Sequence, residues 1–183
     1  MTRATGRDRR PKADMDAARV LDVLRCLERR GAVVWLDGGW AVDALLGEQT
    51  RPHDDLDLVA SLEDVASIHE SLKERGYALA GGGAPGSVEL VDAAGHQVDV
   101  HPVSFTDTGD GLYRMASGEH WVYPAEGFAG AGQILSCQVR CLTAEVMMVC
   151  HSTGYALDET HRRDAAALSE RFAIPVPDYR SGD

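Results

Sequence analysis

The sequence predicts an α+β fold, with a mixed β-sheet flanked by helices and a helical segment at the C-terminal end. Three observations lead to this class. Segments with strand periodicity are interspersed with amphipathic helical segments, two stretches are suited to antiparallel hairpins, and the last part of the chain has a helical pattern. The chain has 183 residues, of which 44% are hydrophobic, and this is enough to bury one globular core.

The first half of the chain alternates between helix and strand. Asp14 or Asp16 can cap the first helix, Gly47 is suited to end the second, and Ser61 begins a capping box with Asp64. The predicted elements are a helix that ends at residue 31, a strand at 33–38, a helix at 39–47, a strand at 54–60 and a helix at 61–76.

The second half contains hairpins and then helices. The glycine-rich segment 81–86 is expected to be a flexible loop, and the first hairpin is expected to turn near residues 93–95. The predicted elements are a strand at 77–80, a hairpin at 87–105, a long loop at 106–132 with one strand near 120–124, a hairpin at 132–142, and helices at 143–155 and 158–172. The chain is thus expected to comprise a disordered basic tail (1–13), a core (14–142), a C-terminal helical segment (143–174) and a final tail (175–183).

The composition argues against several classes of function. The formal net charge is −11 and the basic residues gather in residues 1–13, so the remainder lacks the basic face that nucleic-acid binding needs. No apolar run has the length of a membrane span, and the basic start is not followed by the apolar part of a signal peptide. The four cysteines form no C-x-x-C motif and are expected to be free thiols. We therefore expect a cytoplasmic protein that binds neither nucleic acid nor membrane.

Three aspartates are the strongest candidates for chemistry. Asp55 and Asp57 are two residues apart on the predicted strand 54–60, so their side chains point to the same face. Asp99 alternates with valines on another predicted strand and supplies a third carboxylate. Like charges at short range repel unless a cation lies between them, and oxygen-only ligands suit Mg²⁺ or Mn²⁺. The alternative is a solvated strand face, on which such acidic pairs are common.

A pair of glycines between a strand and a helix suggests a phosphate site. Backbone amides at a helix N-terminus bind phosphate, and Gly38 and Gly39 would let it approach closely. The alternative is a tight strand-to-helix turn. Trp40, which follows the glycines, is expected to pack in the core. Asp43 is expected to interact favourably with the helix dipole, and Asp54 is expected to be a turn or cap residue.

The order of these motifs resembles a known family. G-G-W-x-V-D at 38–43, R-P-H-D-D-L-D-L at 51–58 and V-D-V-H-P at 98–102 are similar to motifs of the lincosamide and aminoglycoside nucleotidyltransferases. These are small antibiotic-resistance relatives of DNA polymerase β, and residues 144–164 also resemble their C-terminal helices. The resemblance covers roughly residues 16–172 and implies a nucleotidyltransferase fold.

The resemblance also implies a reaction, in which an acceptor hydroxyl attacks the α-phosphate of a nucleoside triphosphate and pyrophosphate leaves. The implied cofactor is Mg²⁺ or Mn²⁺. Asp55, Asp57 and Asp99 would be the catalytic metal ligands, and Asp99 is one candidate for the base. The residues implied for the triphosphate are Gly38 and Gly39, with Arg51 and His53 as further candidates.

The acceptor is less well defined by the sequence. Glu89 is a candidate for an alternative base or pocket wall, and His101 lies on the face of the third carboxylate. The C-terminal helices could line an acceptor or base pocket through Tyr155, His151, Arg162 and Asp164. We rank a lincosamide acceptor first because of the motif resemblance, and an aminoglycoside second because the acidic chain suits a polycation. A toxin-type nucleotidyltransferase, a non-catalytic nucleotide-binding module and a homodimer also remain open.

Overall fold

A computed structural model of the protein describes residues 12–153 and 158–177, and its first helices and strands follow the predicted order. Asp16 caps the first helix by accepting a hydrogen bond from the backbone N–H of Arg19, and Gly47 ends the second helix with φ of +80°. The first part of the chain contains α1 (Ala17–Arg29), β1 (Val34–Leu36), α2 (Gly38–Leu46), β2 (Asp55–Ser61), the short 3₁₀ helix η1 (Leu62–Asp64), α3 (Val65–Lys73) and β3 (Ala78–Gly82).

The second part contains one hairpin more than the sequence predicts. The strand expected near 120–124 is confirmed, but a further strand and a 3₁₀ helix form within residues 106–132, so the prediction of a long loop is wrong. The elements are β4 (Val88–Val91), β5 (Gln97–Phe105), β6 (Gly111–Arg114), β7 (His120–Tyr123), η2 (Ala125–Ala129), β8 (Ala131–Ile134), β9 (Cys137–Arg140), α4 (Ala144–Thr153) and α5 (Glu159–Phe172).

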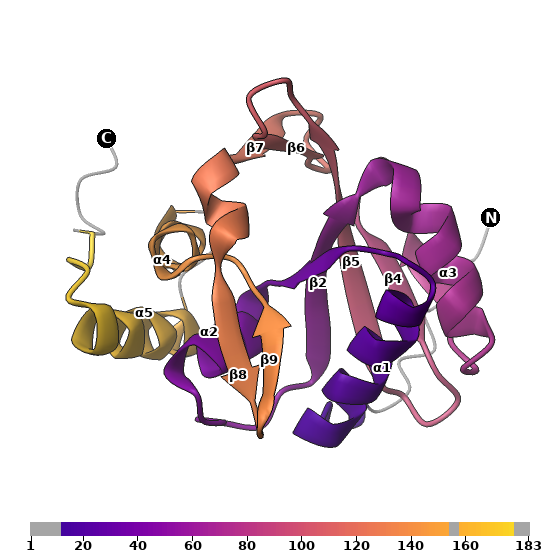
Figure 1. Cartoon of the computed structure of the whole chain (residues 1–183), viewed down its shortest axis with the longest axis horizontal. Coiled ribbons are helices and arrows are strands. Elements are labelled where there is room, and N and C mark those ends of the chain that lie inside the picture. Colours follow the sequence, from indigo (N-terminus) through magenta and orange to yellow (C-terminus); the bar gives the residue numbers. More distant parts are fainter. Residues whose placement is uncertain (1–11, 154–157, 178–183) are drawn as a thin grey trace, which may run out of the picture.

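The main sheet is mixed, which confirms the predicted fold class. Its strand order is β1-β2-β5-β4-β3, with β6 and β7 continuing from the far end of β5. Strands β2 and β5 are parallel, and the other pairs are antiparallel. Strands β8 and β9 form a separate hairpin, which packs against α2. Figure 1 shows β6 and β7 projecting at the top, with α4 and α5 at the opposite side from α1 and α3.

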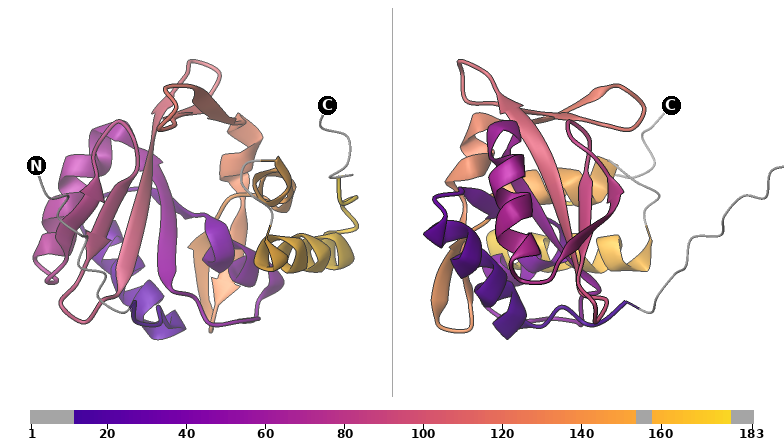
Figure 2. Two further views of the ribbon diagram at one scale, coloured as in Figure 1. Left: turned by 180° about the vertical axis from the view of Figure 1, so that it is seen from behind. Right: turned by 90° about the vertical axis from the view of Figure 1, so that its right-hand side faces the viewer.

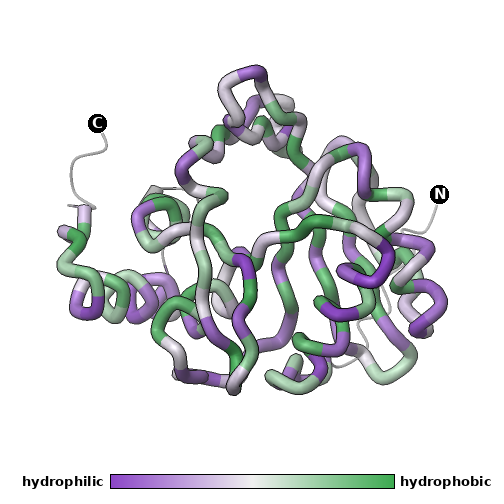
Figure 3. Tube along the Cα trace, in the orientation of Figure 1, coloured by the Kyte–Doolittle hydropathy of each residue, from purple (hydrophilic) through white to green (hydrophobic). Residues whose placement is uncertain are grey.

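One face of the main sheet is covered by α1 and α3, which lie side by side (Figure 2). Hydrophobic and hydrophilic residues alternate along the central strands (Figure 3), so every second side chain enters the core. Leu56, Leu58 and Val98 are fully buried, and Trp40 is 2% exposed, as predicted. Along β2 and β5, the residues that alternate with these buried ones, such as Asp57 and Asp99, belong to the face of the sheet that α1 and α3 leave uncovered.

Three details differ from the sequence prediction. Ser61 ends β2 and its hydroxyl accepts from the backbone N–H of Glu63, so a 3₁₀ turn precedes α3 where one continuous helix was expected. The glycine-rich segment after residue 80 contributes its first two residues to β3. Ala13, placed in the predicted tail, donates a hydrogen bond to the carbonyl of Gly95. The remaining tail predictions fall mainly on residues 1–11 and 178–183, outside the described residues. No helix in the described ranges is both long and apolar enough to cross a membrane.

Candidate active site

The three predicted aspartates occupy adjacent strands on the uncovered side of the sheet. Because β2 and β5 are parallel and in register, Asp57 lies directly beside Asp99 and Asp55 lies beside Gln97. On the other side of β5, Glu89 of β4 pairs with Asp99. We call Asp55, Asp57 and Asp99 the carboxylate face.

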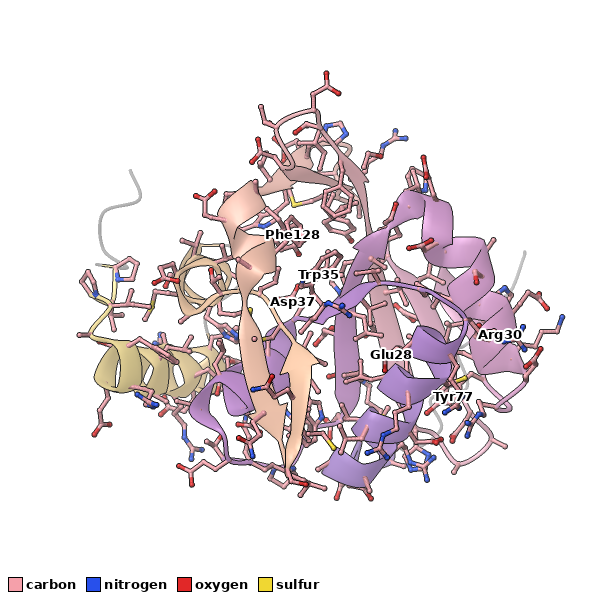
Figure 4. All side chains as sticks on the ribbon, in the orientation of Figure 1. Glu28, Arg30, Trp35, Asp37, Tyr77 and Phe128 are labelled. Atoms are coloured by element: carbon pink, nitrogen blue, oxygen red, sulfur yellow. The ribbon has the colours of Figure 1, made fainter. Side chains whose placement is uncertain are left out.

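The glycine corner at the start of α2 contacts this face. Asp37 caps α2 by accepting from the backbone N–H of Gly38 at 2.8 Å, and its own N–H donates to the carbonyl of Asp57. Gly38 has φ of +57°, and a Cβ there would lie 2.2 Å from Asp57 Oδ2. Glycine is therefore required both for the backbone conformation and for the close approach of the carboxylate. Asp37 lies near the centre of the molecule, close to Trp35 and Phe128 (Figure 4).

The carboxylate face carries more negative charge than its surroundings balance. Burial raises the pKa of Asp57, and the nearby Asp55 and Asp37 raise it further. Burial and repulsion from Asp57 likewise raise the pKa of Asp99 to about 7. Burial alone would lower the pKa of His101, but Asp57 Oδ1, 3.4 Å from His101 Nε2, raises it to about 9.

The donor chemistry of this face fits a hard divalent cation, since all three side chains are carboxylates whose charges crowd one another. The three carboxylates do not form a complete metal-coordination site, because two of them are hydrogen-bonded to other side chains. Lys12 Nζ donates to Asp55 Oδ2 at 2.8 Å, and Gln97 Nε2 donates to both carboxylate oxygens of Asp99 at 2.9 and 2.7 Å. In the part of the chain that the structure describes, no group of three or more His, Cys, Asp or Glu side chains is arranged to hold a metal ion.

The second predicted glycine, Gly39, accommodates side chains of the protein itself. A Cβ there would lie 2.4 Å from His53 Nδ1 and 2.5 Å from Arg51 Nη2. Arg51 Nη1 lies 3.0 Å from His53 Nδ1, and Arg51 Nη2 donates to Asp164 Oδ2 at 3.0 Å. His53 is 3% exposed and its Nε2 lies 2.5 Å from Asp43 Oδ2. We call Asp43, His53, Arg51 and Asp164 the buried polar chain.

This arrangement corrects the prediction for Asp43. It is the sixth residue of α2, beyond the first turn, and it is 2% exposed. Its carboxylate accepts hydrogen bonds from the backbone N–H and the hydroxyl of Thr50 in addition to the contact with His53. Asp43 therefore holds the loop before β2 in place. The expected role, a favourable interaction with the dipole of α2, is replaced by this structural one. Asp54 precedes β2 and is exposed, consistent with a turn residue.

A cavity of about 370 Å³ opens beside the carboxylate face. Its floor includes Asp37, Gly38, Asp57 and His101. This brings the glycine corner, one predicted metal ligand and one predicted substrate residue to a single space.

The other walls of this cavity come from the top hairpin and the C-terminal helices. Strands β6 and β7 and the turn between them supply the side chains of Tyr113, Met115, Trp121 and Tyr123, and the two helices supply Cys150, His151 and His161. Of the candidates on those helices, His151 lines the cavity, Asp164 is buried in the polar chain and Arg162 is exposed. Tyr155 lies outside the described residues.

Sequence reasoning missed several of these residues. Asp37 carries a detectable signal, because an aspartate directly before a glycine pair and an apolar helix is typical of an N-cap. The sequence did not predict the cavity wall formed by Tyr113, Met115, Trp121 and Tyr123, which we call the aromatic wall. These residues lie on or next to β6 and β7, which are short strands in a glycine-rich region. Lys12 and Gln97 belong to no recognisable sequence motif. Their contacts with Asp55 and Asp99 become visible only in the folded structure.

The sequence pattern of the aminoglycoside-2''-adenylyltransferase family matches residues 19–168, most of the chain. The chain belongs to this family. One relative, the lincosamide resistance protein of Staphylococcus haemolyticus, is 29% identical over 146 residues, which are 80% of this chain and 89% of that protein. The predicted family resemblance is thereby confirmed.

Solved structures agree with this family assignment. The crystal structure of the lincosamide antibiotic adenylyltransferase LnuA with lincomycin bound has a TM-score of 0.75 and 26% identity, and covers 86% of this chain and 98% of that one. The structure of ANT(2'')-Ia in complex with adenylyl-2''-tobramycin has a TM-score of 0.66 and 21% identity, with coverage of 85% and 88%. The predicted nucleotidyltransferase fold is confirmed, and it is shared by relatives with either class of acceptor.

Proposed function

We propose that the protein transfers a nucleoside monophosphate from a nucleoside triphosphate to a hydroxyl of a lincosamide, with Mg²⁺ or Mn²⁺ as cofactor. The observation that carries this proposal is the in-register placement of Asp57 beside Asp99 next to the glycine corner and the cavity. Membership of a nucleotidyltransferase family supports the reaction class.

The carboxylate face would bind the cation and orient the α-phosphate. Asp55, Asp57 and Asp99 would hold Mg²⁺, which supplies electrophilic stabilisation of the phosphoryl group when bound. Asp99 would accept the proton of the attacking hydroxyl, and Glu89, its neighbour on β4, would be the alternative base. The acceptor oxygen forms a bond to the α-phosphorus, the bond to the bridging oxygen breaks, and pyrophosphate leaves.

The glycine corner would hold the outer phosphates. The backbone amides at the start of α2 and the helix dipole favour negative charge there. His101, with a pKa near 9, carries a positive charge at neutral pH and lies at the floor of the same cavity. Arg51 and His53 would support this corner from behind Gly39, because both already have protein partners.

The cavity lining favours a lincosamide over an aminoglycoside. The upper wall consists of Tyr113, Met115, Trp121 and Tyr123, which offer aromatic and apolar surface. A polycationic aminoglycoside needs several carboxylates, one near each ammonium group. A lincosamide carries a single amine and a larger apolar fraction, which matches this lining better.

The test is incubation with ATP or GTP, Mg²⁺ and either lincomycin or tobramycin, with the products identified by mass spectrometry. We expect nucleotidylated lincomycin and one pyrophosphate per product, and no product after chelation with EDTA. Product with tobramycin alone would assign the aminoglycoside class. Nucleotide binding without product on either antibiotic would indicate a non-catalytic module.

A further inference from the structure

One polar side chain in the cavity wall lacks a hydrogen-bond partner. His151 on α4 is 5% exposed and lines the cavity. Its Nδ1 is buried and makes no hydrogen bond within the described residues. An unpaired buried polar atom costs about 1–3 kcal/mol, so such an atom in a cavity wall calls for a functional explanation.

The nearest partner for this nitrogen belongs to the buried polar chain. Asp164 Oδ2 lies 3.9 Å from His151 Nδ1 and accepts a hydrogen bond from Arg51 Nη2 at 3.0 Å. Because a hydrogen bond needs about 2.7–3.2 Å, a shift of the ring by roughly 1 Å would close the contact. The carboxylate is thus held in place by Arg51 and has a second oxygen lone pair available to the imidazole.

We propose that His151 is a nucleotide-binding residue and that Asp164, fixed by Arg51, is the residue that positions its ring. The proposal rests on the proposed function, because it assumes that the cavity receives a nucleotide. A carboxylate next to one ring nitrogen selects the tautomer with its hydrogen on that nitrogen. Asp164 would therefore place the hydrogen on Nδ1, and the lone pair of Nε2 would face the ligand.

Burial favours the neutral form of this histidine. Burial lowers the pKa of His151; Asp164 and Asp37 raise it, while His161 and Arg51 lower it. A neutral imidazole does not neutralise a phosphate, but its free nitrogen accepts a hydrogen bond from a hydroxyl or an N–H group. The matching part of a nucleotide is the nucleoside, through a ribose hydroxyl or a base N–H.

The position of α4 and α5 indicates the nucleotide side of the cavity rather than the acceptor side. Both helices pack against α2, whose N-terminal Gly38 is the expected phosphate site. The aromatic wall lies instead next to the carboxylate strand β5, with 5.3 Å between the ring centroids of His101 and Tyr113. The ring of His161 lies 5.3 Å from that of His151 at an interplanar angle of 50°, so the two imidazoles form adjacent parts of this wall of the cavity.

The first test measures binding of a non-hydrolysable ATP analogue with Mg²⁺ by isothermal titration calorimetry. We expect His151→Ala to weaken binding about 10-fold, the value of one hydrogen bond of about 1.4 kcal/mol. His151→Gln places an amide near the depth of Nε2 and should restore binding to within about 3-fold. The matched control is His120→Ala, an exposed histidine on β7, which should change binding less than 2-fold.

The second test measures the His151 pKa by NMR in the nucleotide-free protein. Asp164→Asn removes a group that raises this pKa and should lower it, whereas Arg51→Met removes a group that lowers it and should raise it. Asp164→Asn keeps the shape of the side chain, so this arm does not depend on the more disruptive arginine variant. Opposite shifts would show that Asp164 and Arg51 both act on the His151 ring, and an unchanged pKa in Asp164→Asn would overturn the positioning role of Asp164.

The outcomes separate the two levels of inference. If the wild-type protein binds no nucleotide, the proposed function fails, and the NMR shifts still test the positioning role of Asp164. If wild-type binding is normal but His151→Ala leaves it unchanged, or alters only the affinity for lincomycin, the nucleotide assignment of His151 is overturned. Opposite pKa shifts together with a loss of nucleotide affinity support the proposal in full.

Discussion

Two groups of carboxylates lie near α2, the carboxylate face next to Gly38 and the buried polar chain next to Gly39, and they differ in what surrounds them. On the carboxylate face, Asp57 and Asp99 are direct neighbours, so like charges lie side by side. In the buried polar chain, Asp43 is bonded to Thr50 and contacts His53, while Arg51 lies between His53 and Asp164. Donors also contact Asp55 and Asp99 on the carboxylate face, but there the carboxylates are neighbours of one another. In the buried polar chain, a histidine or an arginine lies beside each acid.

We infer from this difference that the carboxylate face is the functional site and that the buried polar chain is a structural support. Crowding and burial raise the pKa values of Asp57 and Asp99, which means that the folded protein disfavours their charge. Carboxylates whose charged form is disfavoured in this way are found mainly at functional sites. Asp43 is even more deeply buried, but its hydrogen bonds are complete, and burial with full partners is typical of a structural group. The same Asp→Asn substitution should therefore act in opposite ways in the two groups.

The largest expected effect is on turnover, from Asp57→Asn. This variant removes one charge from the proposed cation site while keeping the shape of the side chain, so cation and α-phosphate binding in the transition state should weaken. We expect the rate of nucleotide transfer to fall by about 10³-fold or more. The measurement is steady-state kinetics with the antibiotic that proves to be the acceptor.

The control for this prediction is Asp54→Asn, which changes an exposed carboxylate three residues earlier on the same segment. It should retain activity to within about 2-fold, because Asp54 is exposed and is not among the residues that line the cavity. Similar losses in both variants would show that general acidity of the segment matters, and that the comparison between site and scaffold is wrong.

The second effect is on stability, from Asp43→Asn in the buried polar chain. The substitution replaces an acceptor by an amide beside His53 Nε2 and Thr50, and leaves buried groups without good partners. We expect a loss of about 2–3 kcal/mol in the free energy of unfolding, measured by urea denaturation. Glu48→Gln, at an exposed position just after α2, should change it by less than about 0.5 kcal/mol. An unchanged stability of Asp43→Asn would remove the scaffold half of the comparison.

Much of the fold was predictable because local patterns agree with the tertiary structure. The two-residue period of Asp55–Leu58 and of Val98–His101 placed the acids on one face and the apolar residues in the core. Gly47 ended α2 where expected, whereas α3 ends at Lys73, before the expected Gly76. The β6–β7 hairpin was not predictable, since its four-residue strands are stabilised by pairing with β5 and carry little periodicity of their own.

The shared face of the acids in the candidate site was predictable from the sequence, whereas the side chains that contact these acids were not. The spacing of Asp55 and Asp57 and the valine alternation around Asp99 are local features of the sequence. The role of Gly39 could not be predicted, because the sequence shows a glycine but does not show that His53 and Arg51 fill the space beside it. Contacts such as Arg51 with Asp164 join residues 113 positions apart, and only the folded chain brings them together.

The third effect is a gain in stability, from Asp99→Asn. Because the pKa of Asp99 is raised to about 7, the folded chain holds a proton that the unfolded chain releases near pH 4. Wild-type stability therefore falls as the pH rises from about 4 to about 7, and the variant lacks this loss. We expect the variant to be about 1–2 kcal/mol more stable at pH 8 while it loses turnover.

The pH dependence provides the internal control for this third prediction. Thermal unfolding of both proteins at pH 4.5 and pH 8, without divalent cations, should show a difference that is small at the lower pH and larger at the higher one. A variant that is less stable than wild type at pH 8 would mean that the hydrogen bonds from Gln97 outweigh the repulsion from Asp57. In that case Asp99 would behave like Asp43, and the contrast between the two groups would disappear.

The smallest effect concerns Lys12, a basic side chain that contacts Asp55. Lys12 Nζ lies 2.8 Å from Asp55 Oδ2, and both side chains are partly exposed, so the pair itself contributes at most about 1 kcal/mol. A divalent cation bound at Asp55 would have to displace this ammonium group. Lys12→Met should therefore strengthen Mn²⁺ binding about 3-fold, measured by electron paramagnetic resonance, whereas Lys73→Met on the exposed side of α3 should leave it unchanged. Weaker Mn²⁺ binding in Lys12→Met would instead show that the lysine helps to hold the site together, and that the carboxylate face is partly balanced by the chain's own cations.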